Sequence, residues 1–305
     1  MRLYSHPACL QHDPGPEHPE APARLRAVLQ ALDAPRFAAI ARCEAPRASR
    51  EQLERVHTAD YIDQIFASAP SDGYVQLDPD TVMSPGSLEA ALRAAGAVCA
   101  AINDVQAKQS RRAFCAVRPP GHHAMRHAAM GFCLFNNVAI AAAHALGAHR
   151  IDRVAIVDFD VHHGNGTQAI FRHDPRVLYT SSHQMPLYPG TGAADEHGAG
   201  NIFNAPLPPG AGSTDFRAVW EARLLPELEL FRPQLVLVSA GFDADARDPL
   251  AELHLTPDDY AWITQRLVEL AERHADGRVV STLEGGYDLD ALREDVAAHV
   301  QGLMD

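Results

Sequence analysis

The sequence lacks the long apolar runs and the apolar N-terminal segment that would direct a chain into or across a membrane. No part of its 305 residues contains the roughly 20 consecutive apolar residues needed to span a bilayer. The first 20 residues have no signal-peptide core. We therefore expect a cytoplasmic protein that does not bind membranes.

Cysteine is scarce, and its spacing is irregular. The five cysteines form no CxxC pair, and their odd number argues against a disulfide framework and a cysteine-ligated zinc cluster. We expect reduced thiols that serve mainly in packing. They are Cys9, Cys43, Cys99, Cys115 and Cys133.

Positive charge is also in short supply. Lysine and arginine together number 26 against 39 acidic residues, which gives a net charge of −13. Because such a surface repels phosphates, we expect no nucleic-acid partner. The remaining composition is typical of a globular protein, and no repeat or linker divides it, so residues 1–305 are expected to form one domain.

Short apolar segments rich in β-branched residues alternate with longer helical patterns. Strands are expected at residues 113–117, 153–159, 176–181, 234–240 and 278–284. Helices are expected at residues 84–107, 136–147, 214–231 and 256–274. Apolar strands that alternate with helices predict an α/β fold whose mostly parallel sheet carries helices on both faces.

Polar or glycine-rich residues follow every predicted strand. In chain order these segments read RPPGHHA, DFDVHHGNG, SSHQMPLYPGTG, GFDADARDP and GGYD. Parallel sheets bind ligands beyond the carboxyl ends of their strands. The sequence therefore predicts an active site at that edge.

Two of these segments carry a candidate metal site. Asp160 and His162 lie two residues apart in an extended segment, so their side chains share a face at a spacing of roughly 6–7 Å. Asp243, which follows another strand, is the natural third ligand. Three protein ligands and an open position are typical of catalytic zinc, although this hard donor set also suits Fe(II) or Co(II). The alternative is that these acids cap helices or pair with arginines.

A histidine pair and a tyrosine supply candidate groups for proton transfer. His122 and His123 suit the movement of a proton to and from water at a metal, and Asp158 and Asn165 could fix their tautomers. Tyr287 could donate a hydrogen bond to a developing oxyanion. The alternatives are a structural histidine pair and a packing tyrosine.

Six ordered motifs then point to a known family. RPPGHHA, GFCLFNN, VDFDVHHGNGTQ, YPGTG, SAGFDA and LEGGYD resemble the motifs of the zinc-dependent histone deacetylase family. They are most similar to those of its class II, bacterial histone deacetylase-like amidohydrolase and acetylpolyamine amidohydrolase branches. The resemblance runs from residue 18 to the last helix. It implies an arginase/deacetylase-like fold and hydrolysis of N-acetyl or other N-acyl amides of lysine side chains or similar amines.

The resemblance also assigns roles to individual residues. It implies one zinc ion per chain on Asp160, His162 and Asp243. The catalytic set that it implies comprises the general base and acid His123, its electrostatic partner His122, the orienting groups Asp158 and Asn165, and the carbonyl-polarising Tyr287.

The resemblance also implies a substrate-binding set. It comprises Gly131, Phe132 and Tyr188 along the acyl-lysine stem, Asp80 at the rim and the gatekeeper Leu250. A structural potassium ion is implied at Asp158, the carbonyls of Asp160 and His162, and Ser181–Ser182. Arg24 resembles the arginine of an internal acetate channel.

Two positions separate the branches of the family. Asn165 stands where class I members carry Asp, which points to class II. Leu250 stands where the polyamine-specific enzyme carries Glu, so a distant second ammonium has no anion there. The expected substrates are acylated lysine peptides or proteins, or small acetylated amines.

Three alternative functions remain: an acetylpolyamine amidohydrolase, a two-manganese ureohydrolase of the wider fold, and a non-catalytic acyl-lysine reader. Intact Tyr287 and His123 argue against the reader. The sequence does not specify the physiological substrate, the preferred acyl chain or the native metal. It also does not specify whether the chain forms a homo-oligomer.

Overall fold

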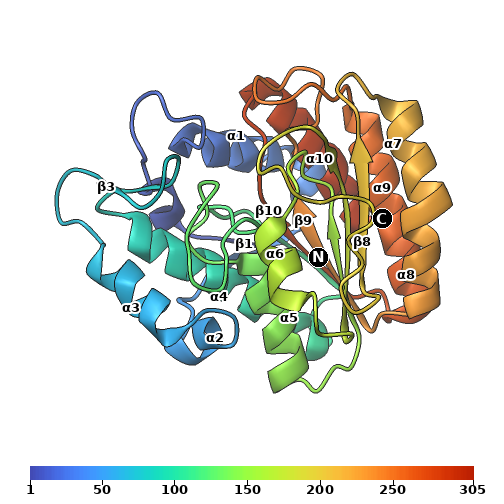
Figure 1. Cartoon of the computed structure of the whole chain (residues 1–305), viewed down its shortest axis with the longest axis horizontal. Helices are drawn as coiled ribbons and strands as arrows, with labels where there is room; N and C mark the ends of the chain where they lie inside the picture. The colour runs from blue at the N-terminus through green and yellow to red at the C-terminus, as the bar shows by residue number, and fades with distance from the viewer.

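Eight parallel strands form the centre of the molecule in the computed structural model, which describes residues 1–305 (Figure 1). Across the sheet their order is β2-β1-β5-β10-β9-β6-β7-β8. The strands are β1 (Arg2–Ser5), β2 (Ala41–Glu44), β5 (Arg112–Cys115), β6 (Val154–Asp158), β7 (Val177–Gln184), β8 (Ile202–Leu207), β9 (Leu235–Ala240) and β10 (Val279–Leu283). A separate antiparallel pair is formed by β3 (Val75–Gln76) and β4 (Val82–Met83).

The five strands expected from the sequence are confirmed, and they are neighbours. In the order β5-β10-β9-β6-β7 they occupy the middle of the sheet. Every residue of β6, β9 and β10 is buried. This explains their continuous apolar sequences, since both faces of a central parallel strand are covered.

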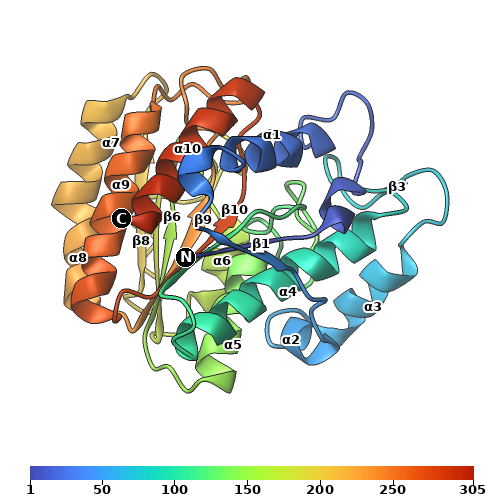
Figure 2. The ribbon, with the colours of Figure 1, turned by 180° about the vertical axis from the view of Figure 1, so that it is seen from behind.

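Helices cover both faces of the sheet, as expected. Figure 1 shows α9 (Pro257–His274) and α10 (Leu289–Met304) on one face, and α4 (Ser87–Gln106) and α5 (Asn137–Ala148) on the other. From behind, α1 (Pro22–Leu32) lies beside α10 (Figure 2). The shorter helices are α2 (Arg50–Glu54), α3 (Ala59–Ala67), α6 (Asn165–Phe171), α7 (Ser213–Val219) and α8 (Leu225–Phe231). Two 3-10 turns lie at Pro7–Leu10 and Pro35–Phe37.

The helix expected at 214–231 is interrupted. A π-helical segment, Trp220–Leu224, separates α7 from α8. Pro226, at the start of α8, has no N–H to donate to the carbonyl four residues earlier. The wider turn accommodates this missing donor while the chain continues in the same direction.

No helix of the structure is both long enough and apolar enough to cross a membrane.

The packing of α10 against α9 buries a carboxyl group that has no partner. Neither carboxyl oxygen of Asp295 forms a hydrogen bond, nor does the hydroxyl of Tyr260 beside it, and both residues are fully buried. Burial raises the pKa of Asp295 to about 9, and the negative charge of Asp245 acts in the same direction. An unfolded Asp titrates near pH ~3.9. The folded state therefore holds an extra proton between these values, and its stability falls as the pH rises through this interval.

We expect Asp295→Asn to stabilise the protein at alkaline pH, because the amide has the same shape and no charge to desolvate. At pH 8 the Tm should rise by at least roughly 2–4 °C, the shift produced by about 1 kcal/mol in a chain of this size. The gain should shrink toward pH 5, because the free-energy cost of keeping this carboxyl group protonated in the folded state falls as the pH approaches its unfolded pKa. Thermal unfolding at pH 5 and at pH 8 measures this gain. Asp290→Asn, at an exposed position of the same helix, is the control. A gain that does not grow with pH would contradict the assignment.

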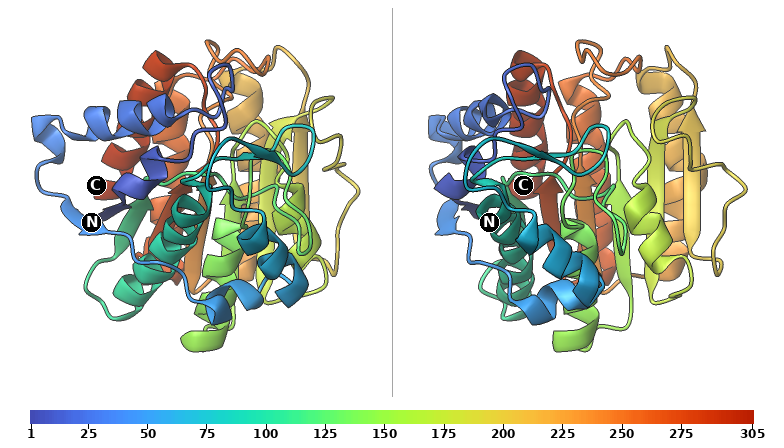
Figure 3. Two further views of the ribbon diagram at one scale, coloured as in Figure 1. Left: turned by 90° about the vertical axis from the view of Figure 1, so that its left-hand side faces the viewer. Right: turned by 60° about the vertical axis from the view of Figure 1, so that its left-hand side comes forward.

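The sheet brings the polar loops together at one edge. The loops after β5, β10, β9, β6 and β7 are adjacent because their strands are. The segment that carries β3 and β4 arches over this edge beside the loop after β5 (Figure 3). Residues from six distant parts of the sequence thus surround one site.

Candidate active site

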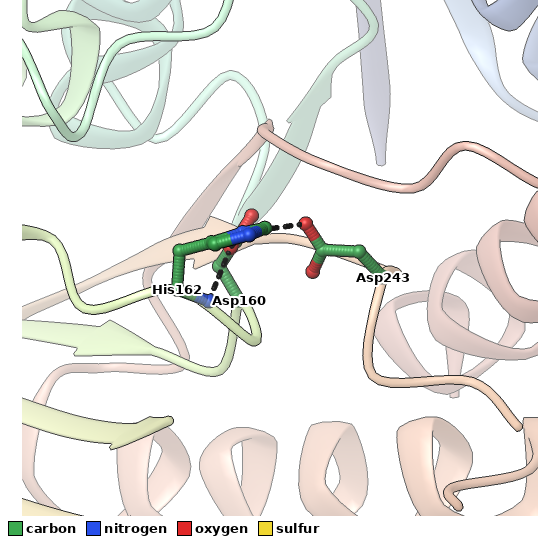
Figure 4. A group of neighbouring side chains, drawn as sticks. All are labelled: Asp160, His162 and Asp243. Carbon is green, nitrogen blue, oxygen red and sulfur yellow. Dashed lines mark hydrogen bonds and ion pairs between the residues drawn. The ribbon is translucent and has the colours of Figure 1, made fainter. Parts of the chain in front are cut away.

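The loops after β6 and β9 bring Asp160, His162 and Asp243 together (Figure 4). Each offers one ligand atom, and the three atoms lie within 4.8 Å of one another. The Nδ1 atom of His162 is 3.1 Å from Asp160 Oδ1 and 3.2 Å from Asp243 Oδ2. The structure thus assembles the three residues that the sequence selected as ligands.

The charge and burial of this group fit a divalent cation. Asp160 and Asp243 are fully buried, so their adjacent charges are poorly screened by water. Burial alone would lower the pKa of His162, but hydrogen bonds to the two carboxylates outweigh it and raise this pKa to about 10. The carboxylates therefore draw a positive charge to the point where the three ligand atoms converge. A dication there would meet two anionic oxygens and one nitrogen, a donor set that suits zinc.

Gly285 lets the backbone approach these carboxylates. Its N–H donates to Asp160 Oδ2 at 2.9 Å, and a Cβ atom there would lie 1.9 Å from Asp243 Oδ2. Any side chain would therefore displace a candidate ligand. This explains why glycine occupies position 285 in the loop after β10.

The two adjacent histidines after β5 lie in different environments. His122 Nδ1 is 3.1 Å from Asp158 Oδ2, and His123 Nδ1 is 2.8 Å from Asn165 Oδ1. Burial opposes a charge on His122, but Asp160 and Asp158 outweigh it and raise the pKa of His122 to about 10. Burial and the positive charges of His122 and His162 lower the pKa of His123 well below its usual value. The pair thus combines a cation with a neutral imidazole that can accept a proton.

Aromatic residues surround a pocket of about 260 Å³ above the histidines. Phe132 and Tyr287 meet edge to face with ring centroids 6.0 Å apart, and Tyr188 lies 5.2 Å from the His123 ring. Tyr188 is 39% exposed, so it stands at the mouth. The pocket joins an apolar channel to the polar groups at its foot.

The remaining substrate-binding candidates also line this pocket. Asp80 and Leu250 lie on its wall, and Asp80 Oδ1 accepts a hydrogen bond from Gly131 N at 3.0 Å. Gly131 has a left-handed φ of 57°, and a Cβ atom there would lie 2.4 Å from the His123 ring. Asp80 therefore has one carboxyl oxygen engaged with the loop that carries Phe132.

The candidate potassium ligands lie on the neighbouring strands β6 and β7 or, for Asp160 and His162, in the loop that follows β6. Parallel pairing places Asp158 of β6 opposite Ser181 of β7. Ser181 contacts His183, and Ser182 Oγ accepts a hydrogen bond from Trp220 at 3.1 Å. A potassium ion at this place stays a prediction.

Arg24 lies below the pocket. Its guanidinium group stacks over the Tyr287 ring at 4.8 Å and donates to Gly286 O at 2.6 Å. Glu20 pairs with it at 3.0 Å, and both side chains are buried. Arg24 is therefore placed to support the loop that carries Tyr287.

Three supporting residues were not selected from the sequence. Glu284 Oε2 accepts hydrogen bonds from the backbone N–H groups of Gly121 and His122, at 2.6 and 3.1 Å, and so ties the histidine loop to β10. Asp248 accepts from Tyr287 N at 2.7 Å and Leu250 N at 2.9 Å. Tyr179 donates to Asp158 Oδ2 at 3.0 Å. The acid at the end of β10 was a visible signal for Glu284, but nothing local in the sequence indicated the partners of the other two.

The chain is similar to known proteins over most of its length. The family model described as the histone deacetylase domain matches residues 18–303. A probable deacetylase of Archaeoglobus fulgidus is 40% identical over 295 residues, which cover 93% of this chain and 80% of that protein. A histone deacetylase-like amidohydrolase of Pseudomonas aeruginosa is 42% identical over 276 residues, covering 88% of this chain and 72% of that protein.

A solved structure extends the comparison to three dimensions. The crystal structure of the HDA15 HD domain superposes with a TM-score of 0.95 at 36% sequence identity. The match covers 99% of this chain and 87% of the other. The similarity therefore includes the central sheet and the loops that hold the candidate site.

Proposed function

The chain belongs to the histone deacetylase family, and from this premise we propose that it hydrolyses N-acyl amides of lysine side chains with one zinc ion per chain. One observation carries the proposal: a neutral histidine and a tyrosine meet three converging ligand atoms at the foot of one narrow pocket. An apolar stem ending in an amide has the shape and polarity that this pocket accepts.

Each group at the foot of the pocket has a task in amide hydrolysis. A divalent ion on Asp160, His162 and Asp243 would polarise the carbonyl and make the attacking water more acidic. His123 accepts the water proton at Nε2 and then donates it to the leaving amine. The Tyr287 hydroxyl donates a hydrogen bond to the carbonyl oxygen as negative charge develops there.

The other residues hold these groups in place. His122 stays cationic beside Asp158 and Asp160, and its charge favours the anionic transition state. Phe132 and Tyr188 contact the substrate stem and exclude water from the reacting amide. Glu284 fixes the backbone of the histidine loop.

A substrate panel tests the proposal. The zinc-loaded protein should release acetate from acetyl-lysine peptides, and the purified protein should contain about one zinc-like ion per chain. Binding of acetyl-lysine without any hydrolysis, with zinc, Fe(II) or Co(II), would favour the non-catalytic reader instead. Hydrolysis confined to acetylated polyamines would favour the acetylpolyamine amidohydrolase.

Leu250 predicts the direction of substrate choice. Its side chain lines the pocket where a carboxylate could hold a second ammonium, a contact worth on the order of 1–3 kcal/mol. We expect kcat/KM for acetyl-lysine peptides to equal or exceed that for acetylspermidine and acetylputrescine. Leu250→Glu should shift the ratio toward the polyamines.

An uncharged variant of similar size, Leu250→Gln, is the matched control for this shift. A wild-type preference for acetylpolyamines of tenfold or more would refute the prediction. The anion would then come from another acid. Asp80 is the first candidate because it lines the pocket, whereas Glu17 is exposed and outside its lining.

A further inference from the structure

The side chain of Asn165 lies between the candidate base and two methionine sulfurs. Its Oδ1 is 2.8 Å from His123 Nδ1, while its Nδ2 is 3.4 Å from Met125 Sδ and 3.2 Å from Met130 Sδ. An amide has one accepting end and one donating end, whereas a thioether sulfur can only accept. The two sulfurs therefore face the end of the amide that can donate to them.

This arrangement determines which nitrogen of His123 carries the proton. With Oδ1 of Asn165 facing it, His123 Nδ1 must donate, and Nε2 is left bare. If the amide rotated by half a turn, its NH₂ group would donate to Nδ1, and the ring proton would move to Nε2. A neutral imidazole protonated at Nε2 cannot accept a proton at that atom.

We propose that Met125 and Met130 are positioning residues that hold the amide of Asn165 in one orientation and so keep Nε2 of His123 free to accept a proton. The part that concerns catalysis rests on the proposed function, while the part that concerns the tautomer does not. Contact between His123 and Asn165 alone cannot select the orientation, because an imidazole nitrogen can either donate or accept. The sulfurs remove that ambiguity.

Backbone hydrogen bonds hold the main chain of both methionines in this loop. Met125 O accepts a hydrogen bond from His57 Nδ1 at 3.0 Å, and Met125 N donates to Ala128 O at 2.8 Å. Met130 pairs with Cys133 through an antiparallel bridge, with N···O distances of 3.0 and 3.3 Å. The two methionines thus approach Asn165 from opposite ends of one turn-rich loop that includes the exposed residues 126–127.

If aspartate replaced Asn165, no single orientation of its side chain would have to be selected. Its two carboxylate oxygens both accept, so either orientation presents an acceptor to His123 Nδ1. This difference supplies an internal control. The methionine sulfurs should matter with asparagine at position 165 and not with aspartate.

The first test is kinetic and uses the zinc-loaded enzyme. Met125→Leu/Met130→Leu keeps apolar side chains of similar volume but removes both acceptors. With acetyl-lysine peptide we expect kcat to fall roughly three- to tenfold, the range for loss of one or two weak hydrogen bonds, while KM stays within about twofold. In an Asn165→Asp background the same two substitutions should leave kcat unchanged. An equal loss in both backgrounds would overturn the proposal, because the methionines would then act only through packing.

The second test reads the tautomer directly. Long-range ¹⁵N–¹H correlation spectra of ¹⁵N-histidine-labelled protein distinguish protonated from bare ring nitrogens, and the His123 signals are those lost in His123→Gln. We expect a protonated Nδ1 and a bare Nε2 in the wild type, and a share of the other tautomer in Met125→Leu/Met130→Leu. An unchanged tautomer would overturn the proposal. The expected tautomer shift in a protein that hydrolyses no amide would uphold it and reject the proposed function.

Discussion

Alanine at Asp160, His162 or Asp243 is expected to abolish both stoichiometric metal binding and amide hydrolysis. The three ligand atoms converge within 4.8 Å, and two ligands hold a dication far less tightly than three. Metal content measured by mass spectrometry and acetate release from acetyl-lysine peptide should fall together. His127→Ala is the control, because this exposed histidine lies outside the pocket. Retention of one ion per chain in all three variants would refute the ligand assignment.

Asp243→Asn separates loss of the ligand from loss of the fold. Its amide oxygen can still accept the hydrogen bond from Val161 N, which is 2.9 Å from Asp243 Oδ1. The substitution also removes one of two adjacent buried carboxylates. Without metal, its Tm should therefore be no lower than that of the metal-free wild type. Added zinc should raise the Tm of the wild type and not that of the variant.

His123→Ala and Tyr287→Phe should each lower kcat by at least about 100-fold while the metal stays bound. The first removes the group that moves the proton, an effect of roughly 10²–10⁴-fold in general acid–base catalysis. The second removes one donor to the oxyanion, which is worth roughly 3 kcal/mol. Neither residue is among the three ligands, so one ion per chain should remain.

The two variants differ in the contacts and groups that remain in the pocket. Tyr287→Phe keeps the ring against Phe132 and over Arg24, so KM should change little. His123→Gln is a useful companion to the alanine variant, because it fills the same space and cannot carry a proton. Near-normal turnover in Tyr287→Phe or in either His123 variant would refute the role of that residue. Loss of metal in His123→Ala would instead make His123 a ligand.

The middle of the fold could be predicted from the sequence because burial there leaves a local signal. A central parallel strand such as β6 is covered on both faces, so Val154–Val157 read as a continuous apolar run. The strand ends at the polar residue Asp158, on the side of the sheet where the carboxyl ends of the strands lie and where ligands bind. The five strands with this signal proved to be five neighbours in the sheet.

The outer strands of the sheet, β1, β2 and β8, gave no such signal in the sequence. β2 is partly or fully exposed along its length and reads Ala-Arg-Cys-Glu, without a β-branched residue. β8 is the opposite edge and contains Asn204 and Pro206, which are unfavourable in a central strand but are tolerated where one side is unpaired. β1 is only four residues long. Pairing with distant strands, rather than local preference, determines all three.

The site residues also divide into those that have a local signal in the sequence and those that have none. Asp160, His162, His122 and His123 could be selected because they cluster directly after predicted strands. The role of Glu284 depends on its contact with backbone 163 residues earlier in the chain. Likewise, nothing in the sequence near Met125 and Met130 indicated that they contact an amide 40 and 35 residues later. Such partners are defined only by the packed structure.

The position of β10 has a consequence for how the chain is assembled during synthesis. β10 is the last of the eight sheet strands along the chain, yet it lies in the middle of the sheet, between β5 and β9. Until residues 279–283 leave the ribosome, β2-β1-β5 and β9-β6-β7-β8 are separate half-sheets, each with an unpaired edge open to aggregation. One half carries the three candidate metal ligands and the other carries the histidine pair. The nascent chain can thus gather its metal ligands first, but the base joins them only when the final strand closes the sheet.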